Sequence, residues 1–199
     1  MKLVILDRDG TINADSDDFV KTPEEWVPLP GSLEAIARLN HAGWHVVVAS
    51  NQSGLGRGLF DVTALNAIHT KMHKMLAAVG GRVDAVFYCP HSPEEGCQCR
   101  KPLPGLFEQI GARFGVQLAG VPTAGDSLRD MQAGASVGCE LHLLLTGKSA
   151  GFDPNGLPGR LPPGTLLHQD LAGFADFLLA RKPKSAAAPQ ATAPTAPLA

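Results

Sequence analysis

The chain has 199 residues, of which 44% are hydrophobic, and a formal net charge of −2 at pH 7. This length predicts one domain, and the apolar content is enough for a substantial core. The charge argues against a dedicated nucleic-acid binder, and no apolar run approaches the roughly 20 residues of a membrane span. The apolar stretch at the N-terminus is too short for a signal peptide, so we expect a cytoplasmic protein.

Apolar strands and amphipathic helices alternate along the chain. The apolar runs predict strands at residues 2–6, 46–49, 85–88, 121–124 and 141–145. Helical spacing predicts a helix with Ser32 as its N-cap that ends near Gly43, and further helices at about 63–79, 106–114, 128–135 and 173–181. This order is typical of an α/β fold: a doubly wound, Rossmann-like parallel sheet that binds ligands beyond the carboxyl ends of its strands.

Two segments have the composition of chain outside a core. Residues 151–164 contain four Pro and four Gly, which favours a surface loop. Residues 183–199 are rich in Ala, Pro, Ser and Thr, which predicts a disordered tail. We therefore assign one domain to residues 1–182 and the tail to residues 183–199.

Polar motifs follow the predicted strands. Asp7-Arg8-Asp9-Gly10-Thr11 comes directly after the first strand, and side-chain alternation predicts that Asp7 and Asp9 share one side while Arg8 points away. Two acids crowded at a strand end are costly unless a cation or a reaction uses them. The later strands are followed by Ser50-Asn51-Gln52-Ser53, Arg100-Lys101-Pro102 and Gly125-Asp126-Ser127-Leu128-Arg129-Asp130.

A cysteine cluster precedes the third of these motifs, in the pattern Cys89-x-His91-x₅-Cys97-x-Cys99. Three thiolates and one imidazole predict a closed, tetrahedral and therefore structural Zn²⁺ site. The alternatives are free thiols or a Cys97–Cys99 disulfide, which would close a small, strained ring. Because the cluster runs directly into Arg100 and Lys101, we expect zinc to orient these two cations toward a substrate.

The four strand-end motifs, in this order, resemble the haloacid dehalogenase (HAD) superfamily of phosphatases over roughly residues 1–150. The resemblance implies that Asp7 attacks phosphorus and forms an aspartyl-phosphate. It implies that Asp9 protonates the departing alkoxide and then deprotonates the water that cleaves the intermediate. Asp130 would anchor Lys101 or a metal-bound water. The implied Mg²⁺ ligands are Asp7, Asp126 and the backbone carbonyl of Asp9, and the implied phosphate- and substrate-binding residues are Ser50, Asn51, Gln52, Ser53, Arg100, Lys101, Asp15 and Asp18.

The gaps between motifs are too short for a cap domain, so we expect an open site shaped by residues 15–22 and the zinc loop. Residues 7–13, 89–91 and 97–102 look like the capless branch that contains heptose bisphosphate and histidinol-phosphate phosphatases. The resemblance implies hydrolysis of the C7 phosphate of D-glycero-D-manno-heptose 1,7-bisphosphate, on the route to the lipopolysaccharide core, with Arg100 in substrate recognition.

Two features depart from that branch and keep alternatives open. Ser127 stands where some heptose enzymes have a Lys. The specificity loop, Asp15-Ser16-Asp17-Asp18, is acidic, which could favour the cationic amine of histidinol phosphate. A non-catalytic zinc or phosphate-binding module and a polynucleotide end phosphatase are further alternatives. We expect a small sugar phosphate as the only partner, and a monomer.

Overall fold

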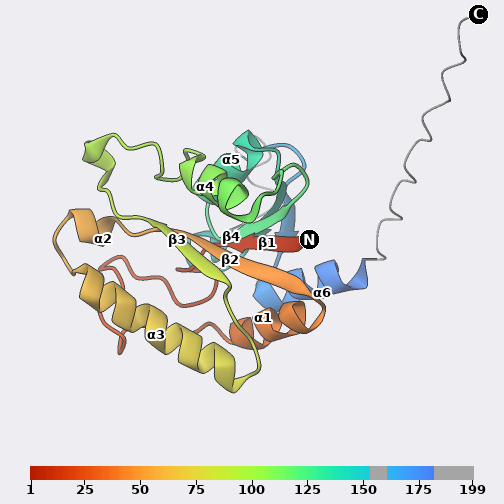
Figure 1. The fold of residues 1–199 in the computed structure, drawn as a ribbon, viewed down its shortest axis with the longest axis horizontal. Coiled ribbons are helices and arrows are strands. Elements are labelled where there is room, and N and C mark those ends of the chain that lie inside the picture. The colour runs from red at the N-terminus through yellow and green to blue at the C-terminus, as the bar shows by residue number, and fades with distance from the viewer. Residues whose placement is uncertain (153–160, 182–199) are drawn as a thin grey trace, which may run out of the picture.

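The computed structural model describes residues 1–152 and 161–181. The predicted tail and the middle of the predicted 151–164 loop lie outside these residues. Six strands form one parallel sheet in the order β3-β2-β1-β4-β5-β6 (Figure 1). This confirms the predicted doubly wound sheet. In chain order, the strands are β1 (Lys2–Leu6), β2 (Trp44–Asn51), β3 (Ala85–Cys89), β4 (Pro122–Gly125), β5 (Glu140–Leu144) and β6 (Leu166–His168).

Helices cover both faces of the sheet. One face carries α1, α3 and α6, and the other carries α4 and α5 (Figure 1). No helix in residues 1–152 and 161–181 is both long and apolar enough to cross a membrane. The bounds are α1 (Ser32–His41), α2 (Ser53–Gly56), α3 (Val62–Ala78), α4 (Gly105–Phe114), α5 (Leu128–Ser136) and α6 (Leu171–Ala180), with short 3₁₀ turns η1 (Pro93–Glu95) and η2 (Gly147–Ser149).

After the exposed Lys2, strand β1 is apolar from Leu3 to Leu6, because both faces of this part are buried. Val4 and Leu6 belong to the core beneath α1, α3 and α6, whereas Leu3 and Ile5 belong to the core beneath α4 and α5. Each buried side chain of this kind stabilises the fold by about 1.5–3 kcal/mol relative to an exposed one. The central strand is thereby fixed, and with it the position of the acidic motif at its carboxyl end.

Two local predictions differ from the structure. The predicted N-cap at Ser32 is wrong: Gly31, with φ 74°, precedes α1, and Ser32 Oγ donates a hydrogen bond to the carbonyl of Ile12 at 2.7 Å. This bond ties α1 to the turn after β1. Strand β6 was not predicted, because three residues after a Gly/Pro-rich segment are too few to show a period of two.

A pair of histidines, one buried and one half-buried, joins β5 to β6. His142 Nδ1 lies 2.9 Å from His168 Nε2, and His142 Nε2 lies 2.9 Å from Glu140 Oε1. His142 is fully buried, and its ring centroid is 4.7 Å from that of Phe174 in α6. Burial lowers the pKa of His142 to about 4.

This pair predicts a loss of stability in mild acid. An unfolded histidine titrates near 6.5, so between pH 6.5 and 4 the unfolded chain binds a proton that native His142 does not. The free energy of unfolding therefore falls as the pH falls through this window, by at most about 3 kcal/mol. The slope of the free energy of unfolding against pH gives the number of protons that unfolding takes up. We expect His142→Gln to reduce this number by about one in denaturant titrations from pH 7 to 4. The exposed His73→Gln is the control, and an unchanged slope in His142→Gln would contradict the assignment.

Candidate active site

The four predicted motifs meet at the carboxyl ends of the strands. This edge includes the point between β1 and β4 where the strand order reverses, which is where doubly wound sheets bind ligands. One pocket there is lined by most of the residues predicted from sequence: Asp7, Asp9, Asp15, Ser50, Asn51, Gln52, Ser53, Arg100, Lys101, Asp126 and Asp130. Asp18 is not among the lining residues, whereas Asp17 of the same loop is.

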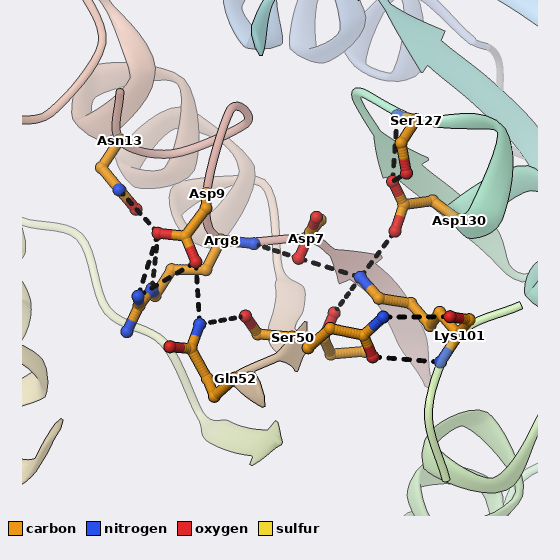
Figure 2. Close-up of polar contacts among 11 residues, drawn as sticks. Asp7, Arg8, Asp9, Asn13, Ser50, Gln52, Lys101, Ser127 and Asp130 are labelled. Carbon is orange, nitrogen blue, oxygen red and sulfur yellow. Dashed lines mark hydrogen bonds and ion pairs between the residues drawn. The ribbon is translucent and has the colours of Figure 1, made fainter. Parts of the chain in front are cut away.

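Lys101 links two of the acids at the bottom of this pocket (Figure 2). Its Nζ lies 2.9 Å from Asp7 Oδ1 and 2.5 Å from Asp130 Oδ1, and it donates to the carbonyl of Ala49 at 2.7 Å. Burial alone would lower the pKa of Lys101, but Asp130 and Asp7 raise it above its ordinary value. The ammonium therefore stays charged between the two carboxylates.

Three carboxylates crowd together beside this lysine. Oxygens of Asp7, Asp126 and Asp130 all lie within 4.8 Å of one another. Burial raises the pKa of Asp7 well above its ordinary value, against the opposing charge of Lys101. Burial and the charge of Asp130 raise the pKa of Asp126 to about 7. Carboxylates confined in this way suit a divalent cation with oxygen ligands, which would favour their ionised forms.

Asp9 is held in a separate clamp, turned away from Lys101 (Figure 2). Its carboxylate accepts bonds from Arg8 Nε at 3.1 Å and Nη2 at 2.9 Å, from Asn13 Nδ2 at 2.9 Å and from Gln52 Nε2 at 2.8 Å. Burial opposes ionisation, but Arg8 and the hydrogen-bonded amides lower the pKa of Asp9 below its ordinary value. In this structure Asp9 is therefore a carboxylate, the form that accepts a proton.

The prediction that Arg8 points away from the acids is wrong. The strand ends at Leu6, and the carbonyl of Arg8 accepts bonds from the amides of residues 11–13 in a turn. Strand alternation therefore does not extend to this residue. The guanidinium of Arg8 is fully buried against Asp9, and its Nη1 lies 3.3 Å from His69 Nε2.

Two predicted substrate-binding residues have side chains that hold other residues of the predicted site in position. Asn51 donates from Nδ2 to the carbonyl of Lys101 and accepts from its amide at Oδ1, both at 3.0 Å. Gln52 bridges Asp9 and Ser50 through Nε2, at 2.8 Å to each. Their direct contact with substrate stays a prediction. In both cases a residue at the carboxyl end of β2 orients a residue from another motif.

A segment that the sequence motifs did not include, Thr146–Ser149, also supports the site. Thr146 Oγ1 donates to the carbonyl of Gly10, the amide of Lys148 donates to Asp126 Oδ2, and Ser149 Oγ donates to the carbonyl of Asp126, each at 2.6 Å. A Cβ at Gly147 would lie 2.1 Å from Asp126 Oδ2, so this approach requires glycine. The signal was present in the sequence, because this segment directly follows the fifth predicted strand.

The cysteine cluster forms beside the pocket as predicted. Cys89 Sγ is 3.6 Å from both His91 Nδ1 and Cys97 Sγ, and His91 Nδ1 is 3.3 Å from Cys99 Sγ. A tetrahedral zinc ion with these ligands separates them by about 3.5–3.8 Å. The four side chains thus fit a structural zinc site. All four cysteines of the chain are free of disulfides, which excludes a Cys97–Cys99 bridge in this structure.

Comparisons with known proteins identify the family. A family model for polynucleotide kinase 3 phosphatases matches residues 2–120, and a HAD-hydrolase-like model matches residues 98–163. A D-glycero-β-D-manno-heptose-1,7-bisphosphate 7-phosphatase of Bordetella bronchiseptica is 59% identical over 179 residues, which are 90% of this chain and 98% of the relative. The chain belongs to the heptose-1,7-bisphosphate 7-phosphatase family of HAD phosphatases.

Other members of the heptose-1,7-bisphosphate 7-phosphatase family agree with this placement. The Pseudomonas aeruginosa enzyme is 51% identical over 177 residues, 89% of this chain and 97% of the relative. The solved D,D-heptose 1,7-bisphosphate phosphatase of B. bronchiseptica, complexed with magnesium and phosphate, superimposes with a TM-score of 0.86. The match covers 90% of this chain and 98% of that one. These relatives therefore match about nine tenths of this chain.

Proposed function

We propose that this protein hydrolyses the C7 phosphate of D-glycero-β-D-manno-heptose 1,7-bisphosphate, as a phosphoric monoester hydrolase in lipopolysaccharide core biosynthesis. One observation carries the proposal. Asp7, Lys101 and Asp126 converge on one pocket in a chain 59% identical to a heptose-1,7-bisphosphate 7-phosphatase. The motifs account for phosphoryl transfer, and the relatives indicate whose phosphate is transferred.

The residues divide the reaction into two steps. In the first, a carboxylate oxygen of Asp7 bonds to phosphorus while the bond to the C7 oxygen breaks, and Asp9 gives that oxygen a proton. In the second, Asp9 takes a proton from water, whose oxygen bonds to phosphorus and releases phosphate and free Asp7. Lys101 remains beside the phosphoryl oxygens in both steps and offsets their charge.

The clamp on Asp9 favours the second step, because it stabilises the carboxylate. The first step needs the protonated form. A substrate phosphate brings negative charge next to Asp9, and a neighbouring like charge raises the pKa of a carboxyl group. We therefore expect substrate binding to load Asp9 with the proton that it then transfers to the alkoxide.

Magnesium is the metal that we propose for the cluster of three carboxylates. Asp7, Asp126 and the carbonyl of Asp9 would hold it, and the crowding of Asp7, Asp126 and Asp130 supports a cation there. The solved B. bronchiseptica relative is complexed with magnesium. Bound in this place, Mg²⁺ would supply positive charge to the phosphoryl oxygens.

Zinc is proposed for the cluster of Cys89, His91, Cys97 and Cys99, on the basis of the ligand distances. Because Arg100 directly follows Cys99 and lines the pocket, loss of zinc should release its guanidinium. We expect Cys97→Ser to lose bound zinc and to raise KM about tenfold or more, with a smaller change in kcat. Cys139→Ser, at a buried cysteine outside the cluster, is the matched control and should keep its zinc. Unchanged KM in zinc-free, folded protein would contradict the positioning role.

The substrate proposal is tested with purified protein, Mg²⁺ and a panel of phosphate esters. We expect kcat/KM to be highest for heptose 1,7-bisphosphate, above histidinol phosphate and a 3′-phosphorylated oligonucleotide. The oligonucleotide is included because a polynucleotide phosphatase model matches the chain. A preference for either competitor would overturn the substrate assignment. Absence of turnover on every ester would overturn the enzyme assignment in favour of a binding module.

Three further expectations accompany this function. We propose that residues 1–182 form the catalytic domain, that the protein acts as a monomer, and that it works in the cytoplasm without a nucleic-acid partner. Light scattering tests the oligomeric state, and we expect the mass of one chain for both the full protein and residues 1–182. Phosphate release tests the domain, and we expect equal kcat/KM for the two proteins.

A further inference from the structure

The mouth of the pocket carries acidic side chains where a doubly phosphorylated substrate must enter. Asp15 and Asp17 both line the pocket, on the loop that follows the first catalytic motif. Opposite charges are available on other lining residues, Arg57, Arg100 and Arg129. A substrate with a second phosphate would be attracted by the arginines and repelled by the two carboxylates.

Lys148 is the residue that engages both carboxylates. Its Nζ lies 2.9 Å from Asp15 Oδ2 and 2.7 Å from Asp17 Oδ1, and it lines the same pocket. The hydrogen bond from Lys148 lowers the pKa of Asp17, so this carboxyl group remains ionised and paired. One ammonium thus offsets two carboxylates at the entrance.

The position of Lys148 is fixed by the catalytic centre itself. Its amide donates to Asp126 Oδ2, and its neighbours Thr146 and Ser149 bond to the carbonyls of Gly10 and Asp126. The side chain therefore starts from the metal-binding edge of the pocket and reaches outward to the acidic loop. Lys148 belongs to none of the four motifs that carry the chemistry.

The pairing of Lys148 with Asp15 and Asp17 affects substrate binding more than the stability of the fold. The side chain of Lys148 is 44% exposed and that of Asp17 95%, and exposed ion pairs contribute little to stability. Charges that line a concave site act on an incoming ion over a longer range, and they raise or lower its local concentration.

Resting on the proposed function, we infer that Lys148 is a specificity-determining residue. By pairing with Asp15 and Asp17 it offsets part of the acidic charge at the pocket mouth, and this allows a second phosphate to lie against the arginines. Lys148 thereby sets the preference for a doubly phosphorylated sugar over a singly phosphorylated ester. The acidic loop, which by itself favours a cationic substrate, is made compatible with an anionic one.

The test compares kcat and KM for heptose 1,7-bisphosphate and p-nitrophenyl phosphate. We expect Lys148→Met to raise KM for the bisphosphate on the order of tenfold, with a smaller rise for the monoester and a nearly constant kcat. In the background Asp15→Asn/Asp17→Asn, the same Lys148→Met change should raise KM for the bisphosphate less than twofold. Arg38→Met, which removes a cation from an exposed ion pair between α1 and α6, is the matched control.

Two results would overturn the role of Lys148. One is an equal rise in KM for both esters, which indicates a structural effect. The other is a tenfold rise that persists without Asp15 and Asp17, which indicates direct contact with substrate. The inhibition of p-nitrophenyl phosphate hydrolysis by heptose bisphosphate also compares how tightly each variant binds the bisphosphate. This comparison does not require that the bisphosphate itself is hydrolysed. Failure of the wild type to hydrolyse the bisphosphate therefore counts against the proposed function, and the variant ratios count for or against Lys148.

Discussion

Replacement of Asp7 by Asn should abolish turnover, with kcat/KM falling by about 10⁴-fold or more. The amide oxygen is a poor nucleophile and cannot form the aspartyl-phosphate. The variant should fold, because Lys101 keeps its ion pair with Asp130 and one of three crowded buried acids is removed. Phosphate release from p-nitrophenyl phosphate measures the loss, and the unfolding midpoint without added metal should not fall below that of the wild type.

Asp9→Asn is the matched variant, because it removes the other acid and leaves the nucleophile. With p-nitrophenyl phosphate the leaving group needs no proton, so only the hydrolysis of the aspartyl-phosphate should slow. We expect a burst of about one nitrophenolate per protein, followed by slow turnover, and no burst from Asp7→Asn. A burst from Asp7→Asn, or equal activity in both variants, would show that the two roles are wrongly assigned.

The sequence predicted the parts of this site that depend on local pattern. Buried apolar runs located the strands, and the parallel sheet then required the motifs at their carboxyl ends to share one edge. That rule brings the motifs that contain Asp7, Asp126 and Asp130 to one edge of the sheet. The cysteine spacing likewise predicted a cluster whose atoms the structure brings within 4.8 Å of one another.

The contacts that orient these groups could not be read from pattern. Asn51 holds the backbone of Lys101, which lies 50 residues away in the sequence, through a loop whose path no periodicity describes. Arg8 folds back on Asp9 because the chain turns immediately after β1, and alternation applies only to extended backbone. No sequence pattern distinguishes Lys148 from other exposed loop lysines, because its two carboxylate partners lie about 130 residues away in the sequence.

Replacement of Lys101 by Met should reduce both activity and stability. Without the ammonium, Asp7 and Asp130 are buried carboxylates with no cation between them, and breaking a buried pair in this way costs about 3–5 kcal/mol. Turnover should fall about 10²- to 10³-fold, because Lys101 no longer offsets charge on the phosphoryl group. Denaturant unfolding at pH 7 without metal, together with phosphate release, measures the two effects.

The cause of the instability in Lys101→Met can be separated from simple loss of packing. If uncompensated acids are responsible, their pKa values rise, and the deficit relative to the wild type should shrink as the pH falls and the carboxyl groups take up protons. Millimolar Mg²⁺ at pH 7 should shrink it also, since a cation bound by Asp7 and Asp126 replaces part of the lost charge. Lys71→Met is the control, because within residues 1–152 and 161–181 Lys71 Nζ donates to two carbonyls, those of Pro23 and Trp26, and to no carboxylate. A deficit in Lys101→Met that is independent of both pH and Mg²⁺ would mean that the lysine stabilises the fold through its aliphatic chain, and that Asp7 and Asp130 do not depend on its charge.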